Sequence, residues 1–534
     1  MTSTTSAVVY SLNKMTPLPH AETSDPTRGI ESGYPLVRDD LPLRRFHPLL
    51  LLLLIAGIVL GGITIGLCTG TSDPGMLRSL TEGFPPTWPG GLASLAVGAL
   101  FVIPLIWVIK SDSLDLVAFF LAWEAMIMCG YFFLGVTAWK LNGGLGPGIL
   151  ATAPLVVLIN SVGFAILLSV MGFTYALMKR FRIGLADLRG SSHEGDVRLK
   201  WVLRLTGLLT ILILVLPMGI TGIIPMFVSD PSAGEIDPRL MVTESSSLRA
   251  LYNLGYGLMP FITAGLALLC IRRARRFFGI DGILIVALML AQLLSGNRFP
   301  LALAGITTLC LISMEWRIPR FLLAGSFALY MLFFTALGGL TGLLRWDRGL
   351  LSEGNPIVHS IEAAFTGNNL IDVRDASWVM SQWDFEPLHG ITYLGGLTAF
   401  LPSGLFPQKK EWHLGLTAVR IVGWDDAKHP GLRITFFGES FINFGLAGVI
   451  TLGTILGILF GVLLRAFHQA SQDHPSSLNR NLRILILMEM TLHLSNTSNA
   501  FSFWALALFL MIQWLFVERH TGVPSQALHD SDRS

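Results

Sequence analysis

Four arginines are candidates for chemistry, and one of them, Arg298, lies in strongly apolar sequence, where a guanidinium needs an anionic partner or contact with water. They are Arg298, Arg374, Arg420 and Arg433. The planar guanidinium can hold a phosphate with two parallel hydrogen bonds, so these residues point to a phosphorylated ligand. An arginine in the middle of a lipid-facing helix would cost about 3 kcal/mol. Arg298, in Ser-Gly-Asn-Arg-Phe-Pro, is therefore expected to face a cavity or a partner.

Each of these arginines also has a structural interpretation. Arg298 and Arg433 could be interfacial anchors, whose long side chains reach the lipid headgroups. Arg374 stands in Asp-Val-Arg-Asp (372–375), and the local sequence favours pairing with those acidic neighbours.

Glu439 and Asn443 are four residues apart and so share one face of a helix. A carboxylate in the first turn of a membrane span is costly unless it is paired or functional. Glu439 is therefore a candidate general base, or the partner of Arg433 in a structural ion pair. His389, His413 and His429 are candidates for proton transfer, since imidazole titrates near neutral pH.

The sequence predicts no metal site. The histidines of this region, at 389, 413 and 429, are too widely spaced for a compact ligand pattern. Asp425 and Asp426 are better explained as a solvated turn. Trp378, Trp383 and Trp424 could stack on sugar rings, or belong to an interfacial aromatic belt.

The elements that position these residues are predicted to be membrane helices. Hydrophobic residues make up 52% of the 534-residue chain and charged residues 13%, too few to cover a soluble fold of this size. The fold expected is all-α, with about 12 spans, each near the length of about 20 residues that a bilayer requires. The apolar runs fall at 48–68, 91–109, 113–138, 150–178, 202–228, 252–271, 279–295, 299–316, 320–344, 436–464, 483–497 and 500–517.

The basic residues predict the orientation. With both termini cytoplasmic, 24 of the 37 Lys and Arg residues fall on the inside, as the positive-inside rule favours. The predicted organisation is a disordered cytoplasmic tail (1–47), nine spans (48–344), a large periplasmic loop (345–435), three spans (436–517) and a cytoplasmic tail (518–534). Residues 390–407 are too short and too rich in Gly and Pro to span, and are expected to be re-entrant or interfacial.

Three features resemble the bacterial O-antigen polymerases, the Wzy-type oligosaccharide repeat-unit polymerases. The first is the hairpin Ser-Gly-Asn-Arg-Phe-Pro-Leu-Ala-Leu around Arg298, and the second is the large outer loop late in the chain. The third is the stretch from Gly438 to Gly448, similar to the family's Gly-Glu-x-x-x-Asn-Phe-Gly-x-x-Gly. Together these features cover roughly residues 290–450.

The resemblance implies a GT-C-like glycosyltransferase of the bacterial inner membrane, working on the periplasmic face without a cofactor. It would polymerise polyprenyl-pyrophosphate-linked oligosaccharide repeat units into an O-antigen or exopolysaccharide. The catalytic candidates are then Arg298, Arg374, Arg420, Arg433, Glu439 and His389, and the substrate-binding candidates are Asn443, Trp378, Trp383, Trp424 and His429. The lipid bilayer and a chain-length regulator are the candidate partners, and nucleic acid is not expected.

Two other functions fit parts of this pattern. An O-antigen ligase uses the same donor but a lipid A core acceptor, and the Gly438–Gly448 stretch favours a polymerase. A secondary transporter also suits twelve spans. However, a two-halved transporter should have related halves joined by a central cytoplasmic segment, and here the middle connection is short.

Overall fold

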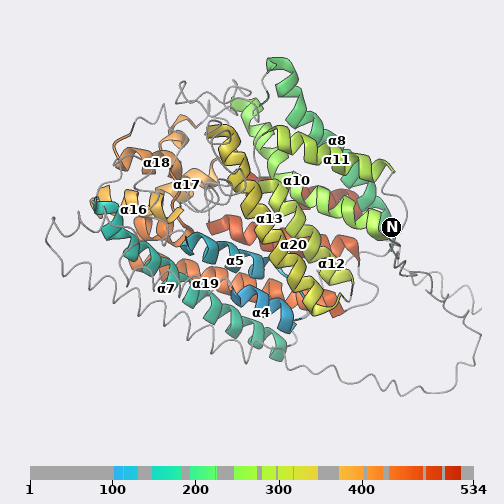
Figure 1. Ribbon diagram of the computed structural model, residues 1–534, viewed down its shortest axis with the longest axis horizontal. Helices are drawn as coiled ribbons and strands as arrows, with labels where there is room; N and C mark the ends of the chain where they lie inside the picture. Colours follow the sequence, from blue (N-terminus) through green and yellow to red (C-terminus); the bar gives the residue numbers. More distant parts are fainter. Residues whose placement is uncertain are drawn as a thin grey trace, which may run out of the picture. The chain divides into compact units, whose positions relative to one another are not determined.

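In the computed structural model, all the regular secondary structure of the described residues is helical (Figure 1). The described residues are 102–111, 113–129, 147–181, 193–222, 224, 246–272, 279–295, 299–316, 318–346, 372–401, 406–424, 432–472, 477–495 and 500–518. Their helices are α4 (Val102–Ser111), α5 (Leu116–Cys129), α7 (Pro147–Phe181), α8 (His193–Thr221), α10 (Ser246–Arg272), α11 (Ile280–Leu294), α12 (Phe299–Glu315), α13 (Arg320–Trp346), α16 (Asp372–Gln382), α17 (Ile391–Leu397), η2 (Pro407–Lys410), α18 (Leu414–Ile421), α19 (Phe436–Gln472), α20 (Leu478–Ser495), α21 (Ala500–Gln513) and η4 (Trp514–Glu518).

The helices follow the apolar runs of the sequence. Every run expected from residue 150 onward contains a helix, and the nearly continuous run 279–316 divides between α11 and α12. The run 483–517 divides in the same way between α20 and α21. The expected run 48–68 and the tail 1–47 lie outside the described residues.

Among the described residues, four helices are long enough and apolar enough to cross a membrane, and several shorter apolar helices accompany them. The four segments are Leu155–Met178, Gly195–Thr221, Ala250–Arg272 and Phe436–Ser471. The exposed surface of the bundle is itself apolar, which suits hydrocarbon better than water. Large exposed apolar side chains include Leu205, Leu212, Ile220, Ile283, Val286, Met289, Phe321, Leu329 and Phe333. Length, composition and these faces support a multi-pass membrane protein.

A polar network around Arg272 ties one end of the bundle together. Its guanidinium pairs with Glu315 at the end of α12 (Nε to Oε2, 2.7 Å) and with Asp196 near the start of α8 (Nη1 to Oδ2, 3.1 Å). Asp196 also accepts the backbone amides of Leu478 and Asn479, both at 3.1 Å, and so caps the first turn of α20. The starts of α8 and α20 therefore meet the ends of α10 and α12. This is the network end.

The opposite end holds the starts of α7 and α21, together with α16 and α17. The Thr152 hydroxyl, near the start of α7, donates to the Ser377 carbonyl of α16 at 2.6 Å. Phe400, just after α17, packs against Trp504 near the start of α21, with their ring centroids 4.3 Å apart. We call this end, where residues 372–424 lie, the loop end.

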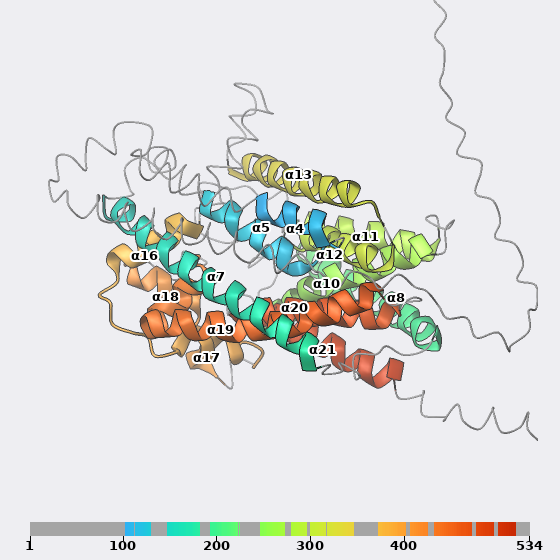
Figure 2. The ribbon, with the colours of Figure 1, turned by 90° about the horizontal axis from the view of Figure 1, so that it is seen from below.

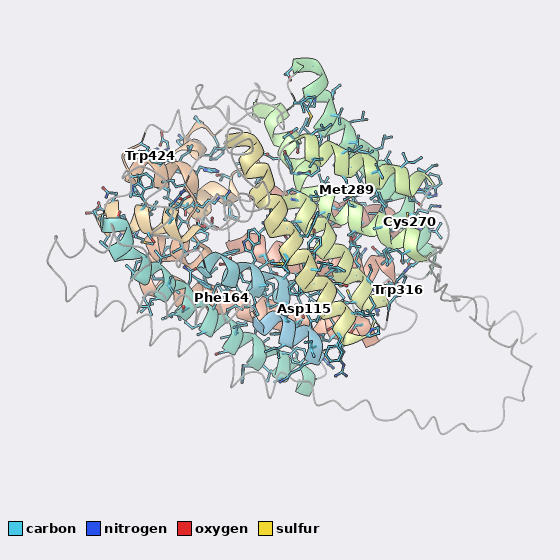
Figure 3. All side chains as sticks on the ribbon, in the orientation of Figure 1. Asp115, Phe164, Cys270, Met289, Trp316 and Trp424 are labelled. Atoms are coloured by element: carbon cyan, nitrogen blue, oxygen red, sulfur yellow. The ribbon has the colours of Figure 1, made fainter. Side chains whose placement is uncertain are left out.

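The two ends are separate in Figure 3. Trp424, directly after α18, lies at the loop end. Cys270 and Trp316, which neighbour Arg272 and Glu315 in the sequence, lie at the network end. Residues 372–401 and 406–424 therefore lie together at one end of the bundle.

A seam of glycines lets α19 pack closely against α7 (Figure 2). A Cβ at Gly453, Gly457 or Gly461 would lie 3.0, 2.7 or 2.8 Å from a backbone carbonyl oxygen of α7. Small residues at four-residue spacing are typical of tightly packed membrane helices. This seam holds the part of α19 from Gly453 to Gly461 against α7.

The seam gives a test that is independent of function. Gly457→Leu is expected to lower stability by about 1–3 kcal/mol, since the side chain must push two backbones apart. Thermal unfolding of the solubilised protein measures this as a lower Tm. Gly325→Leu is the matched control, because a Cβ there meets no atom within 4 Å. Equal Tm values for the two variants would contradict the close packing.

Candidate functional site

The candidate site lies at the loop end, where α16, α17 and α18 pack beside the N-terminal starts of α7 and α19 (Figures 1 and 2). Residues 432–435 are non-helical and lead into α19. Asn160 Nδ2 of α7 donates to Thr435 Oγ1 at 2.9 Å, and the same oxygen accepts the Gly438 amide at 3.2 Å. This contact fixes the first turn of α19, which carries Glu439.

Two arginines and two aspartates form a charged cluster between α16 and the approach to α19. Arg374 Nη2 lies 2.7 Å from Asp375 Oδ1, the local pairing that the sequence favours. The backbone amide of Arg433 donates to Asp375 Oδ2 at 3.4 Å. The Arg433 guanidinium lies 3.5 Å from Asp372 Oδ1, across 61 positions of sequence. The cluster thus joins the two arginine-bearing segments.

The four charges of this cluster sum to zero, yet they differ in exposure. The Arg433 side chain is 55% exposed, whereas that of Arg374 is 14% exposed. Burial raises the pKa of Asp372, and the positive charge of Arg433 opposes that rise. Arg433 is therefore the arginine of this cluster that an anionic ligand can reach, while Arg374 mainly holds Asp375.

Glu439 and Asn443 are both buried, with 1% and 0% exposure, and both contact Thr392 of α17. Glu439 Oε1 accepts the Thr392 hydroxyl at 2.7 Å. Asn443 Nδ2 donates to Thr392 Oγ1 at 2.7 Å and to the Glu439 carbonyl at 2.9 Å. The shared helix face predicted for these two residues is confirmed, and that face is directed at α17.

The loop before α17 caps a break in α19. Gly445 has φ 62° and ψ −153°, outside helical geometry, so the outer turns of α19 end just before it. Carbonyls at such a break need other donors. Ile442 and Asn443 receive them from the amides of Leu388 (2.9 Å) and His389 (3.0 Å).

His389 lies at a strained position in this loop. Its φ is 50°, a left-handed conformation unusual for a residue other than glycine, and Gly390 follows with φ 85°. The Gly390 amide donates to Asn443 Oδ1 at 2.9 Å, which holds the turn against α19. The His389 side chain is exposed, so an imidazole stands in solvent beside the buried Glu439–Asn443 pair. Strained residues of this kind cluster at functional sites.

No protein-family model, curated protein or solved structure matches this chain. The candidate site therefore stands on its own geometry.

The three tryptophans have different surroundings. Trp378 and Trp424 pack edge to face, with ring centroids 4.4 Å apart, and both are partly exposed. Trp383 is 8% exposed, and its Nε1 donates to the Glu386 carbonyl at 2.9 Å. Trp378 and Trp424 thus offer a surface to a sugar ring, whereas Trp383 is mostly enclosed.

Other predicted residues lie on α18 or outside the described residues. Arg420 is exposed on α18 and donates to the Glu411 carbonyl at 3.2 Å. Arg298, His429, Asp425 and Asp426 lie outside the described residues. Within the described ranges, no three His, Cys, Asp or Glu residues are placed to hold a metal ion.

Sequence reasoning missed Thr392, the residue that connects α17 to Glu439 and Asn443. It stands in the apolar stretch Ile-Thr-Tyr-Leu, where one hydroxyl gives no signal. Part of the expected re-entrant or interfacial segment 390–407 forms α17, seven residues long. Its exposed side bears Ile391, Leu394 and Leu397, as expected of a helix at a lipid interface.

Proposed function

We propose that this protein is a bacterial inner-membrane glycosyltransferase. It polymerises polyprenyl-pyrophosphate-linked oligosaccharide repeat units on the periplasmic face. In this proposal the chain has about twelve spans and cytoplasmic termini, and the loop end faces the periplasm. The 24-to-13 division of basic residues supports that orientation. The network end carries segments assigned to the inside, and the loop end carries segments assigned to the outside.

One observation carries the proposal. The Gly438–Gly448 stretch, which bears the resemblance to O-antigen polymerases, docks its Glu439 and Asn443 on the outer-loop residues 388–392. Arg433, six residues before Glu439, has a side chain that is more than half exposed. A carboxylate, an exposed guanidinium and an exposed imidazole are thus gathered at one end of the bundle. These are the groups that glycosyl transfer from a pyrophosphate requires.

The proposed reaction begins with a hydroxyl of one lipid-linked repeat unit, which attacks the anomeric carbon of another. The bond from that carbon to the pyrophosphate oxygen breaks, and its electron pair stays on the leaving pyrophosphate. Arg433, together with Arg298, stabilises this growing negative charge by preorganised hydrogen bonding. Glu439 accepts the proton of the attacking hydroxyl, with His389 as the alternative base. Trp378 and Trp424 contact the sugar.

Deletion of the gene tests this function. The proposal predicts that the deletion strain loses long surface glycan chains on a gel and keeps single repeat units attached, and that the plasmid-borne gene restores the long chains. Loss of every repeat unit would instead indicate a ligase. An unchanged glycan pattern would contradict both activities and favour the transporter.

A further inference from the structure

The hydrogen atoms of the Asn443–Thr392–Glu439 network can be assigned from the chemistry of the groups. The Asn443 amide nitrogen carries two hydrogens, and it contacts the Thr392 hydroxyl oxygen and the Glu439 carbonyl. Its Oδ1 accepts the Gly390 amide, which confirms the orientation of the side-chain amide. Thr392 Oγ1 therefore accepts from Asn443 and has one hydrogen left to donate.

That remaining hydrogen goes to Glu439. Thr392 Oγ1 lies 2.7 Å from Glu439 Oε1, and Thr392 and Glu439 are 0% and 1% exposed. Because the network runs in one direction, from amide to hydroxyl to carboxylate, Oε1 is held as a hydrogen-bond acceptor. This hydrogen bond lowers the basicity of Oε1 and so favours Oε2 as the atom of Glu439 that binds a proton.

We propose that Thr392 is a positioning residue for the general base, and that Glu439 Oε2 is the atom that takes the proton. This inference rests on the proposed function. As the acceptor oxygen bonds to the anomeric carbon, its proton moves to Oε2. The electron pair of the broken bond leaves with the pyrophosphate, and the proton later passes to water. Thr392 holds the carboxylate in one orientation throughout and touches no reacting atom.

α17 supports this role because it gives Thr392 a fixed place. The helix begins at Ile391, directly after the His389–Gly390 turn that is bonded to Asn443. Thr392 is thus fixed from two sides, by its own helix and by the amide of Asn443. Serine retains the hydroxyl and valine retains the shape, so the two substitutions separate hydrogen bonding from packing.

The experiment measures polymerisation by the purified full-length protein in lipid nanodiscs, with a polyprenyl-pyrophosphate repeat unit as substrate. Thr392→Val is expected to lower kcat by about tenfold to a hundredfold, the usual effect of losing a hydrogen bond to a charged group. KM should change little, because Thr392 does not touch the substrate. Thr392→Ser should restore most of kcat. Thr398→Val is the matched control, since that exposed hydroxyl bonds only within its own segment and its loss should leave kcat unchanged.

The outcomes distinguish failure of the positioning role of Thr392 from failure of the proposed polymerase activity. If the wild type polymerises, Glu439→Gln does not, and folded Thr392→Val has normal kcat, the positioning role is wrong and the function stands. A rise in KM with unchanged kcat would also overturn the positioning role. If the wild type makes no polymer from this substrate, the proposed function itself fails.

Discussion

Arg433→Ala and Arg298→Ala are each expected to abolish long glycan chains while leaving the amount of protein in the membrane unchanged. Both residues are assigned to the side on which a polyprenyl pyrophosphate presents its phosphates. The Arg433 guanidinium is accessible there, at 55% exposure. Removing one preorganised donor to a developing charge typically costs about 3 kcal/mol, or a hundredfold or more in rate. The measurement is glycan chain length on a gel at matched protein level.

Lysine at either position should rescue only partly, because it keeps the charge and loses the two-pronged geometry. Arg433 also contacts Asp372, so its loss leaves that carboxylate with less compensation. The lysine variant separates this loss of compensation from the loss of the ligand contact, since it retains a positive charge near Asp372. Arg320→Ala, at an exposed arginine far from the loop end in the sequence, is the control and should give normal chains. Near-normal chain length in either alanine variant would make that arginine an interfacial anchor.

Glu439→Gln is expected to remove polymerisation and to leave folding and binding of the lipid-linked substrate intact. The glutamine side-chain oxygen can still accept the Thr392 hydroxyl, which lies 2.7 Å from Oε1 in the wild type. The amide nitrogen that replaces the other oxygen cannot accept a proton. Loss of a general base typically lowers the rate by about a hundredfold to ten-thousandfold.

The amount of protein decides between the two roles considered for Glu439. A structural ion pair with Arg433 remains a prediction, and under it Glu439→Gln should reduce the protein level in the membrane. Under the catalytic role, protein level and thermal stability should match the wild type while chain length falls to single repeat units. Normal chains at normal protein level would end the catalytic hypothesis.

Local features of this fold were predictable from the sequence, because length and hydropathy determine which segments are apolar helices. The ends of α11 at Leu294 and of α20 at Ser495 follow from breaks in two apolar runs. The Arg374–Asp375 pair was predictable in the same way, since its members are neighbours in the chain. So was the common helix face of Glu439 and Asn443.

Long-range features were not predictable by the same reasoning. The contact between Arg433 and Asp372 joins residues 61 positions apart, and that between Thr392 and Glu439 joins residues 47 apart. Nothing in either local sequence identifies the partner. The glycines of α19 show small-residue spacing in the sequence, but only the packing against α7 identifies the helix that they contact.

Polymerisation of lipid-linked repeat units is measured most directly with the purified wild-type protein in lipid nanodiscs. The protein is supplied with a polyprenyl-pyrophosphate oligosaccharide repeat unit, and the products are separated by size. We expect a ladder of glycans that grows by whole repeat units, with polyprenyl pyrophosphate released once for each step. The same ladder should be missing with Glu439→Gln. Folded wild-type protein that leaves the repeat unit unchanged would contradict the account.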